Sequence, residues 1–208
     1  MLSTNRERPI VADLPARFAA AQLDDLDANL RARLAETPER WHVFSGGTGR
    51  GKSHAMAALF RDDWAEAARQ FYASPAWIEW AEFLADVKAH WDLKTSDADA
   101  FDPLRWACTF RGMLCLDDVG AEIGDFGAER FARIVQARYS SSLPLTVTTN
   151  LRAAQVGERY GDRSLSRITE CAEWIVMDGP DRRLAAHARR RDRTRQRAEN
   201  DDLFAERT

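Results

Sequence analysis

The sequence contains little cysteine and no long apolar segment. Its three cysteines, Cys108, Cys115 and Cys171, are scattered among 208 residues and form no C-x-x-C pair. This distribution excludes a disulfide framework and a cysteine-based zinc site, and it favours a reducing compartment. Residues 1–9 are polar, unlike the apolar core of a signal peptide. Because no apolar run approaches the roughly 20 residues of a membrane span, we expect a soluble cytoplasmic protein that makes no membrane contact.

The chain also lacks an excess of either charge. Its formal net charge is −3, so any contact with nucleic acid has to come from a local basic patch. The most basic segment, residues 182–197, contains eight arginines and is followed by an acidic end. This segment could follow the phosphates of DNA, dock on a partner protein or form a solvated helix, and charge runs are more often solvated.

One segment does carry a strong chemical signal, the glycine-rich stretch 46–53. It fits the phosphate-loop pattern G-x-x-x-x-G-K-[ST] at every fixed position. A short apolar β-forming run precedes it, and an Ala/Leu/Met-rich stretch typical of a helix follows. This context places backbone N–H groups and a positive helix end around one anion. We therefore expect ATP to bind to Gly46, Gly47, Thr48, Gly49, Arg50, Gly51, Lys52, Ser53 and His54, with the Ser53 hydroxyl also a ligand of Mg²⁺.

The alternation of strand and helix patterns predicts an α/β fold with a five-stranded parallel sheet covered on both faces. We expect strands at 41–44, 70–74, 112–119, 143–149 and 173–178. Helices are expected at 23–34, 52–69, 76–91, 128–139 and 153–170, the last interrupted near Gly161. The predicted organisation is a flexible lead over 1–12, a core over 13–185 and a charged tail over 186–208.

Two predicted strands end in polar residues that suit a nucleotide. The run 113–118 is apolar and ends in Asp117 and Asp118, and in open α/β sheets ligands bind at the carboxyl ends of the strands. Asp117 can hold the Mg²⁺ that Ser53 contacts, and Asp118 can orient or deprotonate the attacking water. Asn150 follows the strand 143–149 and could face the γ-phosphate, although an ordinary Asn turn is the commoner arrangement on pattern alone.

Three tryptophans, Trp77, Trp80 and Trp91, repeat along the helix expected at 76–91. Such rings could stack on the bases of single-stranded DNA. A buried apolar stripe is the usual outcome of this spacing, so we expect the three rings to be core.

The order and spacing of these motifs resemble the AAA+ ATPases of the DnaC/IstB type, which are bacterial helicase loaders and transposition helpers. The residues that carry the resemblance lie in the segments 14–18, 46–53, 115–120, 138–151, 161–168 and 179–183. The T-T-N-L and G-x-R-x-x-S-R-[IL] segments are the most specific of them. The resemblance covers residues 13–185 and implies an AAA+ P-loop fold with ATP and Mg²⁺ bound.

The resemblance also implies roles for particular residues. Asn150 is expected to be the first sensor of the nucleotide. Arg167 is expected to be the arginine finger that reaches the ATP of a neighbouring subunit, with Arg163 as the second choice. Arg183, together with Arg182, is expected to be the second sensor. A guanidinium at the transferred phosphoryl group raises the rate by about 10³–10⁵, which is the chemical reason for such a residue.

The function implied is an ATP-hydrolysing helicase loader in DNA replication, with a replicative helicase as partner, single-stranded DNA as a further contact and a homo-oligomer formed on ATP binding. Two departures keep alternatives open. Asp118 stands where many members of the family have Glu, and only about a dozen residues precede the expected core, where loaders usually have a partner-binding domain. The alternatives are an IstB-like transposition helper and a weakly hydrolysing, nucleotide-gated helicase-binding protein. A small-molecule kinase is disfavoured, because no arginine-rich lid is recognisable.

Overall fold

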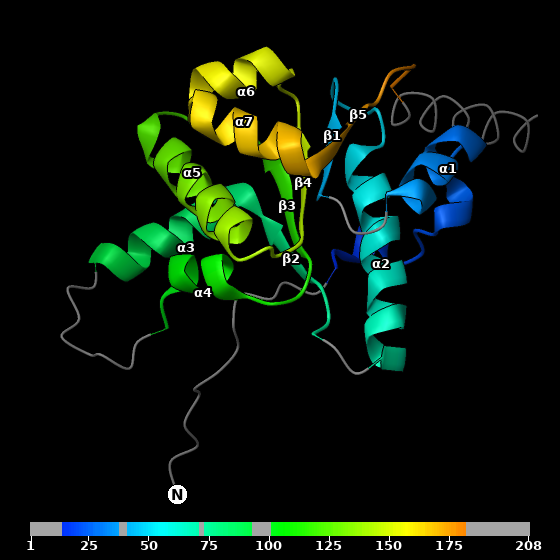
Figure 1. The fold of residues 1–208 in the computed structure, drawn as a ribbon, viewed down its shortest axis with the longest axis horizontal. Coiled ribbons are helices and arrows are strands. Elements are labelled where there is room, and N and C mark those ends of the chain that lie inside the picture. The colour runs from blue at the N-terminus through cyan, green and yellow to red at the C-terminus, as the bar shows by residue number, and fades with distance from the viewer. Residues whose placement is uncertain (1–13, 38–40, 71–72, 93–100, 182–208) are drawn as a thin grey trace, which may run out of the picture.

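The structure, a computed structural model, describes residues 14–37, 41–70, 73–92 and 101–181. Its centre is a five-stranded sheet in the order β2-β3-β4-β1-β5 (Figure 1). Every pair of neighbouring strands is parallel. The strands are β1 (Trp41–Ser45), β2 (Ala76–Glu79), β3 (Leu114–Val119), β4 (Leu145–Thr149) and β5 (Ala172–Val176). The α/β fold with five parallel strands is therefore confirmed.

Helices cover both faces of the sheet. The 3₁₀ helices η1 (Ala16–Phe18) and η2 (Leu23–Asp25) precede α1 (Ala28–Glu36), and α1 lies with α2 (Lys52–Gln70) on one face. The other face carries α3 (Trp80–Asp92), α4 (Pro103–Thr109), α5 (Asp125–Ser140), α6 (Ala153–Tyr160) and α7 (Asp162–Cys171). Figure 1 shows these two layers on either side of the strands, and the interruption of the last helical segment at Gly161 is as predicted.

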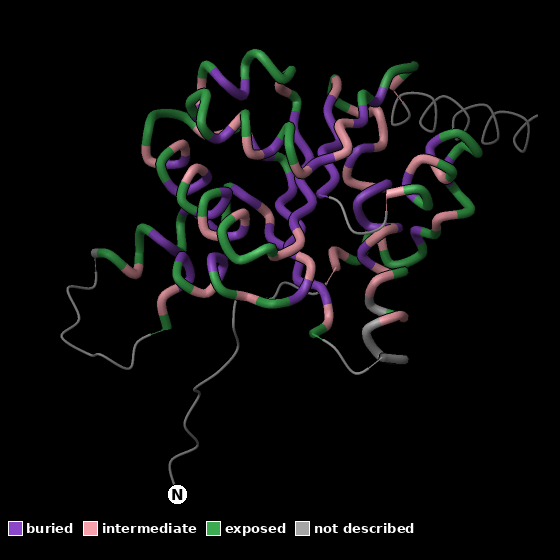
Figure 2. The backbone as a smooth tube through the Cα atoms, viewed as in Figure 1, coloured by how far each residue is buried: buried purple, intermediate pink, exposed green. Residues whose placement is uncertain are grey.

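Each face of the sheet has its own apolar cluster. Phe44, Trp77 and Cys115 belong to the cluster under α1 and α2, whereas their neighbours Val43 and Ile78 belong to the cluster under α3–α7. This alternation follows from the two-residue repeat of a strand. The inner strands β1, β3 and β4 are consequently buried on both sides, as the colouring of Figure 2 shows. This burial fixes the register that sets the positions of the polar residues at their carboxyl ends.

The second strand was predicted at the wrong place. Instead of 70–74, β2 covers Ala76–Glu79, and the helix expected at 76–91 begins only at Trp80. The helical spacing of Trp77 and Trp80 is coincidental, since Trp77 is a strand residue whose ring contacts Phe18 and Phe60 beneath α2. A short apolar run buried on both sides cannot be assigned to strand or helix from periodicity alone.

Two further differences concern this part of the chain. Trp77 and Trp80 are buried as expected, but Trp91 is 57% exposed, so its prediction as core was wrong. Helix α4 was not predicted at all. Its signal is the pair Asp102-Pro103, since the Asp102 side chain accepts a hydrogen bond from the N–H of Arg105 at 3.0 Å and proline occupies the first turn.

A fully buried arginine joins the ends of several elements. Arg138 of α5 has no exposed surface, and burial lowers the pKa of its guanidinium to about 10. The guanidinium donates hydrogen bonds to backbone carbonyl oxygens of Ala107, Phe110, Gly112 and Pro144. These carbonyls belong to the segment from α4 to β3 and to the residue before β4. Arg138 therefore replaces water for carbonyls that would otherwise be buried without a donor.

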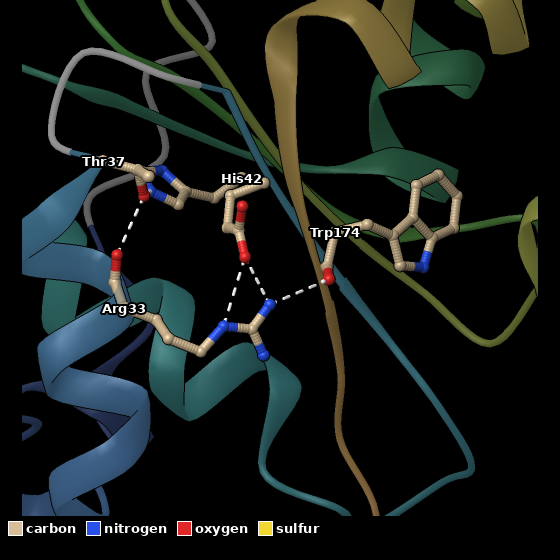
Figure 3. A network of polar contacts seen from close by, with 5 residues as sticks. Arg33, Thr37, His42 and Trp174 are labelled. Carbon is tan, nitrogen blue, oxygen red and sulfur yellow. Dashed lines mark hydrogen bonds and ion pairs between the residues drawn. The ribbon is translucent and has the colours of Figure 1, made fainter.

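The first helix is attached to the sheet by a polar network (Figure 3). The Arg33 guanidinium of α1 pairs with the carboxylate of Glu173 and donates to the carbonyl of Trp174 at 3.2 Å, both in β5. Thr37 donates to the carbonyl of Arg33 at 2.9 Å, and its hydroxyl lies 3.5 Å from Nε2 of His42 in β1. Burial lowers the pKa of His42 to about 4, so the imidazole is neutral at pH 7.

Within the described residues, we find no helix with the length and apolar character needed to cross a membrane. The expected lead 1–12 and tail 186–208 lie outside the described residues, as does the arginine-rich segment 182–197, and their organisation stays a prediction.

Candidate nucleotide-binding site

The predicted phosphate loop lies between β1 and the first residue of α2, at the carboxyl edge of the sheet. Gly46 and Gly49 have φ angles of 138° and 75°, in the region that favours glycine. A Cβ atom on Gly46 would lie 2.4 Å from the carbonyl oxygen of Met177, and one on Gly49 would lie 2.0 Å from the Asp181 carboxylate. The loop therefore needs glycine for backbone conformation and for the close approach of the segment after β5.

The lysine of the loop is buried and held over it. Lys52 is 7% exposed, and its ammonium donates to the carbonyl oxygens of Gly46 and Gly47, both at 2.9 Å. The same Nζ atom donates to Oδ1 of Asn150 at 2.6 Å. Asn150 follows β4, which pairs with β1. The sheet order thus brings the predicted sensor residue into direct contact with the predicted phosphate-binding cation.

The first of the two acidic residues of β3, Asp117, contacts the serine of the loop. Asp117 is buried, and its Oδ1 accepts hydrogen bonds from the hydroxyl of Ser53 at 2.7 Å and from that of Thr148 at 2.6 Å. Hydroxyl and carboxylate oxygens are donors that Mg²⁺ prefers. The two residues predicted to hold the metal therefore form an oxygen donor pair that fits this ion.

Thr148 was not singled out in the sequence. Its hydroxyl donates to Asp117 and accepts a hydrogen bond from the backbone N–H of Asp118 at 2.8 Å. One hydroxyl in β4 thus fixes both acidic residues of β3. The available signal is the T-T-N segment itself, in which Thr148 stands two residues before Asn150.

Asp118 has an unusual backbone conformation. Its φ angle is 60°, a left-handed value that is uncommon outside glycine. The residue is exposed, and its Oδ1 accepts a long hydrogen bond of 3.4 Å from the Asn150 side chain. This residue lies where the pairing of β3 with β4 is irregular, between Leu116 and Val119, and its backbone directs the carboxylate toward Asn150, whereas Asp117 faces the loop.

The loop after β3 is clamped to α6. The Glu122 carboxylate accepts hydrogen bonds from the Gly120 N–H at 2.8 Å and from the Tyr160 hydroxyl at 2.6 Å, and it pairs with Arg159 at 3.3 Å. Burial alone would raise the pKa of Glu122, but these donors hold it below its ordinary value. The clamp fixes the exit of β3 directly beyond Asp118.

Most of the predicted site residues line one cavity of about 600 Å³, whereas Gly46 and Gly47 are not among its lining residues. This volume is in the range of small-molecule sites. Its walls include the predicted residues Thr48, Gly49, Arg50, Gly51, Lys52, Ser53, His54, Asp117, Asp118 and Asn150. Arg17, Phe18 and Glu79 also line it. Sequence reasoning gave none of these three a place in the site, because their approach depends on the fold of η1 and on the true position of β2.

Among the described residues that line the cavity, neither Arg163 nor Arg167 is present. Arg163 is exposed at the start of α7. The Arg167 guanidinium lies over the ring of Tyr139 at 5.5 Å, and the hydroxyl of that tyrosine donates to Glu170 at 2.9 Å. An arginine finger acts on the ATP of a neighbouring subunit and therefore lies away from the cavity of its own chain. The roles expected of Arg167 and Arg163 stay predictions. The second-sensor residues Arg182 and Arg183 lie outside the described residues.

Solved structures of other proteins share this architecture, although no protein-family model and no curated protein sequence matches the chain. The DnaC helicase loader is similar over 78% of this chain and 99% of its own, with 20% identity and a TM-score of 0.64. DnaI is similar over 81% and 93%, with 25% identity and a TM-score of 0.58. The replication initiator DnaA, solved with AMPPCP and single-stranded DNA, is similar over 77% and 50%, with 16% identity and a TM-score of 0.60. The fold of this chain is therefore similar to that of the DnaC helicase loader, DnaI and DnaA, which confirms the expected AAA+ P-loop architecture.

Proposed function

We propose that this protein binds and hydrolyses ATP and acts in DNA replication as a loader of a replicative helicase. The observation that carries the proposal is the meeting of Lys52, Ser53, Asp117 and Asn150 in one cavity at the carboxyl edge of the sheet. A loop cation, a metal-binding hydroxyl and an acidic strand end together form the set that phosphoryl transfer requires.

The proposed roles follow from the contacts. The phosphate loop and Lys52 bind the outer phosphates of ATP, which compete with Asn150 and the loop carbonyls for the ammonium. Ser53 and Asp117 hold Mg²⁺, and this ion neutralises charge on the phosphates. Asp118 and Asn150 face the same cavity and are placed to orient the attacking water.

The proposal of a role in replication comes from the structural neighbours. Two of them are a DnaC helicase loader and DnaI, and a third is a replication initiator bound to a nucleotide and single-stranded DNA. We extend to this chain a replicative helicase as partner, single-stranded DNA as a further contact, ATP-dependent homo-oligomerisation and a place in the cytoplasm. Arg167, or failing it Arg163, would complete the site of the next subunit.

The test is capture of the replicative helicase of the same organism by the purified full chain, with and without ATP. ATP turnover is then measured with and without single-stranded DNA. Nucleotide-dependent capture together with turnover supports the loader. Capture without turnover would leave a nucleotide-gated helicase-binding protein, for which the short side chain of Asp118 is the motivating feature. ATP turnover without capture would contradict the loader and favour a transposition helper.

A further inference from the structure

The residues that follow β5, 177–181, return to the phosphate loop, and we call them the return segment (orange in Figure 1). The N–H of Met177 donates to the carbonyl of Ser45 at 2.7 Å, which extends the pairing of β5 with β1. Met177 is buried, whereas residues 178–180 are exposed. The return segment is therefore anchored at its first residue, directly beside the start of the loop.

The far end of the return segment brings a carboxylate to the loop. Gly179 has a φ angle of 119° and Pro180 follows it, so the chain turns in a conformation that favours glycine. After this turn Asp181 is half-buried, and a Cβ atom on Gly49 would overlap its carboxylate. The return segment thus places a negative charge against the middle of the phosphate loop.

The same part of the loop is expected to bind phosphate. Backbone N–H groups and the start of α2 provide a positive field for anions, and this field also attracts the Asp181 carboxylate. Gly49 lines the cavity, whereas Asp181 is not among the lining residues. A phosphate in the cavity and the carboxylate would therefore both lie near Gly49 without touching, and like charges at such a distance repel each other appreciably.

The cavity has no surplus of positive charge that would offset this repulsion. Among its described lining residues, three cationic side chains stand against three that are formally anionic: Arg17, Arg50 and Lys52 against Glu79, Asp117 and Asp118. These formal charges cancel, and Asp181 adds a negative charge beside them. A Mg²⁺ ion held by Ser53 and Asp117 would neutralise about half of the charge of a bound triphosphate.

We propose that Asp181 makes the site selective for metal-bound nucleotide, because its carboxylate repels the phosphates of metal-free ATP and ADP more strongly than those of their Mg²⁺ complexes. This role rests on the proposed ATPase function. Phosphoryl transfer needs the metal, so metal-free ATP would occupy the site without being hydrolysed. The charge of Asp181 acts against that unproductive complex.

The test is titration calorimetry of the full chain with ATP and with ADP, each with Mg²⁺ and with EDTA. Asp181→Asn keeps the size of the side chain and removes its charge. It should strengthen the binding of metal-free ATP about tenfold and that of Mg²⁺-bound ATP by no more than about threefold. The gain should shrink when NaCl rises from about 0.05 M to about 0.5 M, because salt screens a partly exposed charge. Asp181→Glu should retain the selectivity, and Asp181→Ser replaces Asp181→Asn if the asparagine disturbs folding.

The matched control is Asp178→Asn in the same segment. Asp178 is exposed and lines a small hollow beside α1 together with Arg33 and Val176, so its substitution should leave all four affinities unchanged. The role of Asp181 is overturned if Asp181→Asn brings no gain for metal-free ATP, an equal gain with and without Mg²⁺, or a gain that the control shares. If the unaltered chain binds no ATP even with Mg²⁺, the proposed function itself fails, and this outcome is distinct from a chain that binds ATP but owes no selectivity to Asp181.

Discussion

At the scale of single residues, the site is held by hydroxyl and amide groups that come from neighbouring strands. Thr148 of β4 supports both acids of β3, and Asn150 contacts both Lys52 and Asp118. Such contacts depend on the order and register of the strands. The geometry of the site consequently depends on the whole sheet, although the phosphate loop 46–53 is itself a local sequence motif.

Replacing Thr148 with valine keeps its shape and removes its hydroxyl, which tests this support. We expect Mg²⁺-dependent ATP affinity to fall about tenfold and the free energy of unfolding to fall by about 1–3 kcal/mol, since an acceptor and a donor in the interior lose their partner. The measurements are calorimetric titration and denaturant unfolding.

The control is Thr146→Val on the same strand, because the buried Thr146 hydroxyl donates to the sulfur of Met113 at 3.5 Å and not to an acidic residue of the site. Equal effects of the two substitutions on ATP affinity would contradict a special role of Thr148.

The glycine loop and Asp117 could be predicted from the sequence, because fixed spacing and an apolar strand define them locally. Thr148, Arg17 and Glu79 could not, because their contacts depend on which strands are neighbours and on where β2 lies. Arg138 was also missed as a structural residue. A charged side chain in a helix gives no sign that four carbonyls surround it.

At the scale of elements, α1 is attached to the sheet through the network of Figure 3, in which His42 is buried and neutral. The pKa of His42 is about 4 in the folded chain, against an ordinary value of 6.5. The His42 imidazole therefore binds a proton more readily in the unfolded chain than in the folded chain. The contribution of His42 to stability is complete above pH 6.5 and is lost as the pH falls from 6.5 toward 4, up to about 3 kcal/mol.

Denaturant unfolding between pH 7 and pH 4 measures this dependence. His42→Gln should reduce the loss of unfolding free energy in this interval relative to the unaltered chain, because no buried imidazole has to gain a proton. His90→Gln, at a half-buried position of α3, is the control and should retain the full loss. If His42→Gln and the unaltered chain give parallel curves, the buried neutral state of His42 is wrong.

The helices and strands could be predicted where flanking glycine or proline residues agreed with the spacing of the apolar residues. They could not be predicted where such flanking residues were missing. The break at Gly161 carries a glycine with φ of 85° and was predicted. The boundary between β2 and α3 has no glycine or proline, so the helical spacing of the tryptophans misled the prediction. The short α4 has a cap signal but too few residues for a periodic pattern.

At the scale of the whole molecule, the proposed function requires contact between subunits. We expect Arg167→Ala to lower ATP turnover by about 10³ while leaving the ATP affinity of the single chain unchanged, as for a guanidinium that acts on the ATP of a neighbour. Turnover of the unaltered chain should also rise more than linearly with protein concentration.

Mixing variants tests the contact in trans. Arg167→Ala chains retain a complete nucleotide site, and Lys52→Ala chains retain Arg167, so the mixture should recover turnover that neither has alone. The exposed Arg133 of α5 offers the control Arg133→Ala, which should remain active. A mixture as inactive as its components, or an equal loss of affinity and turnover in Arg167→Ala, would point to a structural role through the ring of Tyr139.

The α/β class and the parallel sheet of the molecule could be predicted, because a phosphate loop between a strand and a helix occurs in few folds. The strand order and the path of η1 and η2 across α2 could not, since no local pattern specifies which elements are neighbours in space. No local sequence pattern identifies the proposed helicase partner either, and its proposal is based on the similarity to other solved structures.

Calorimetric titration of the full chain with ATP, with and without Mg²⁺, tests the proposed nucleotide site most directly when the unaltered chain is compared with Lys52→Ala. We expect saturable binding of one ATP per chain that is tighter with Mg²⁺. Lys52→Ala should weaken this binding at least about 100-fold, since a charged partner of the phosphates is removed inside a buried site. Unchanged affinity in the Lys52→Ala chain would contradict the claim that the loop and Asp117 form one nucleotide site.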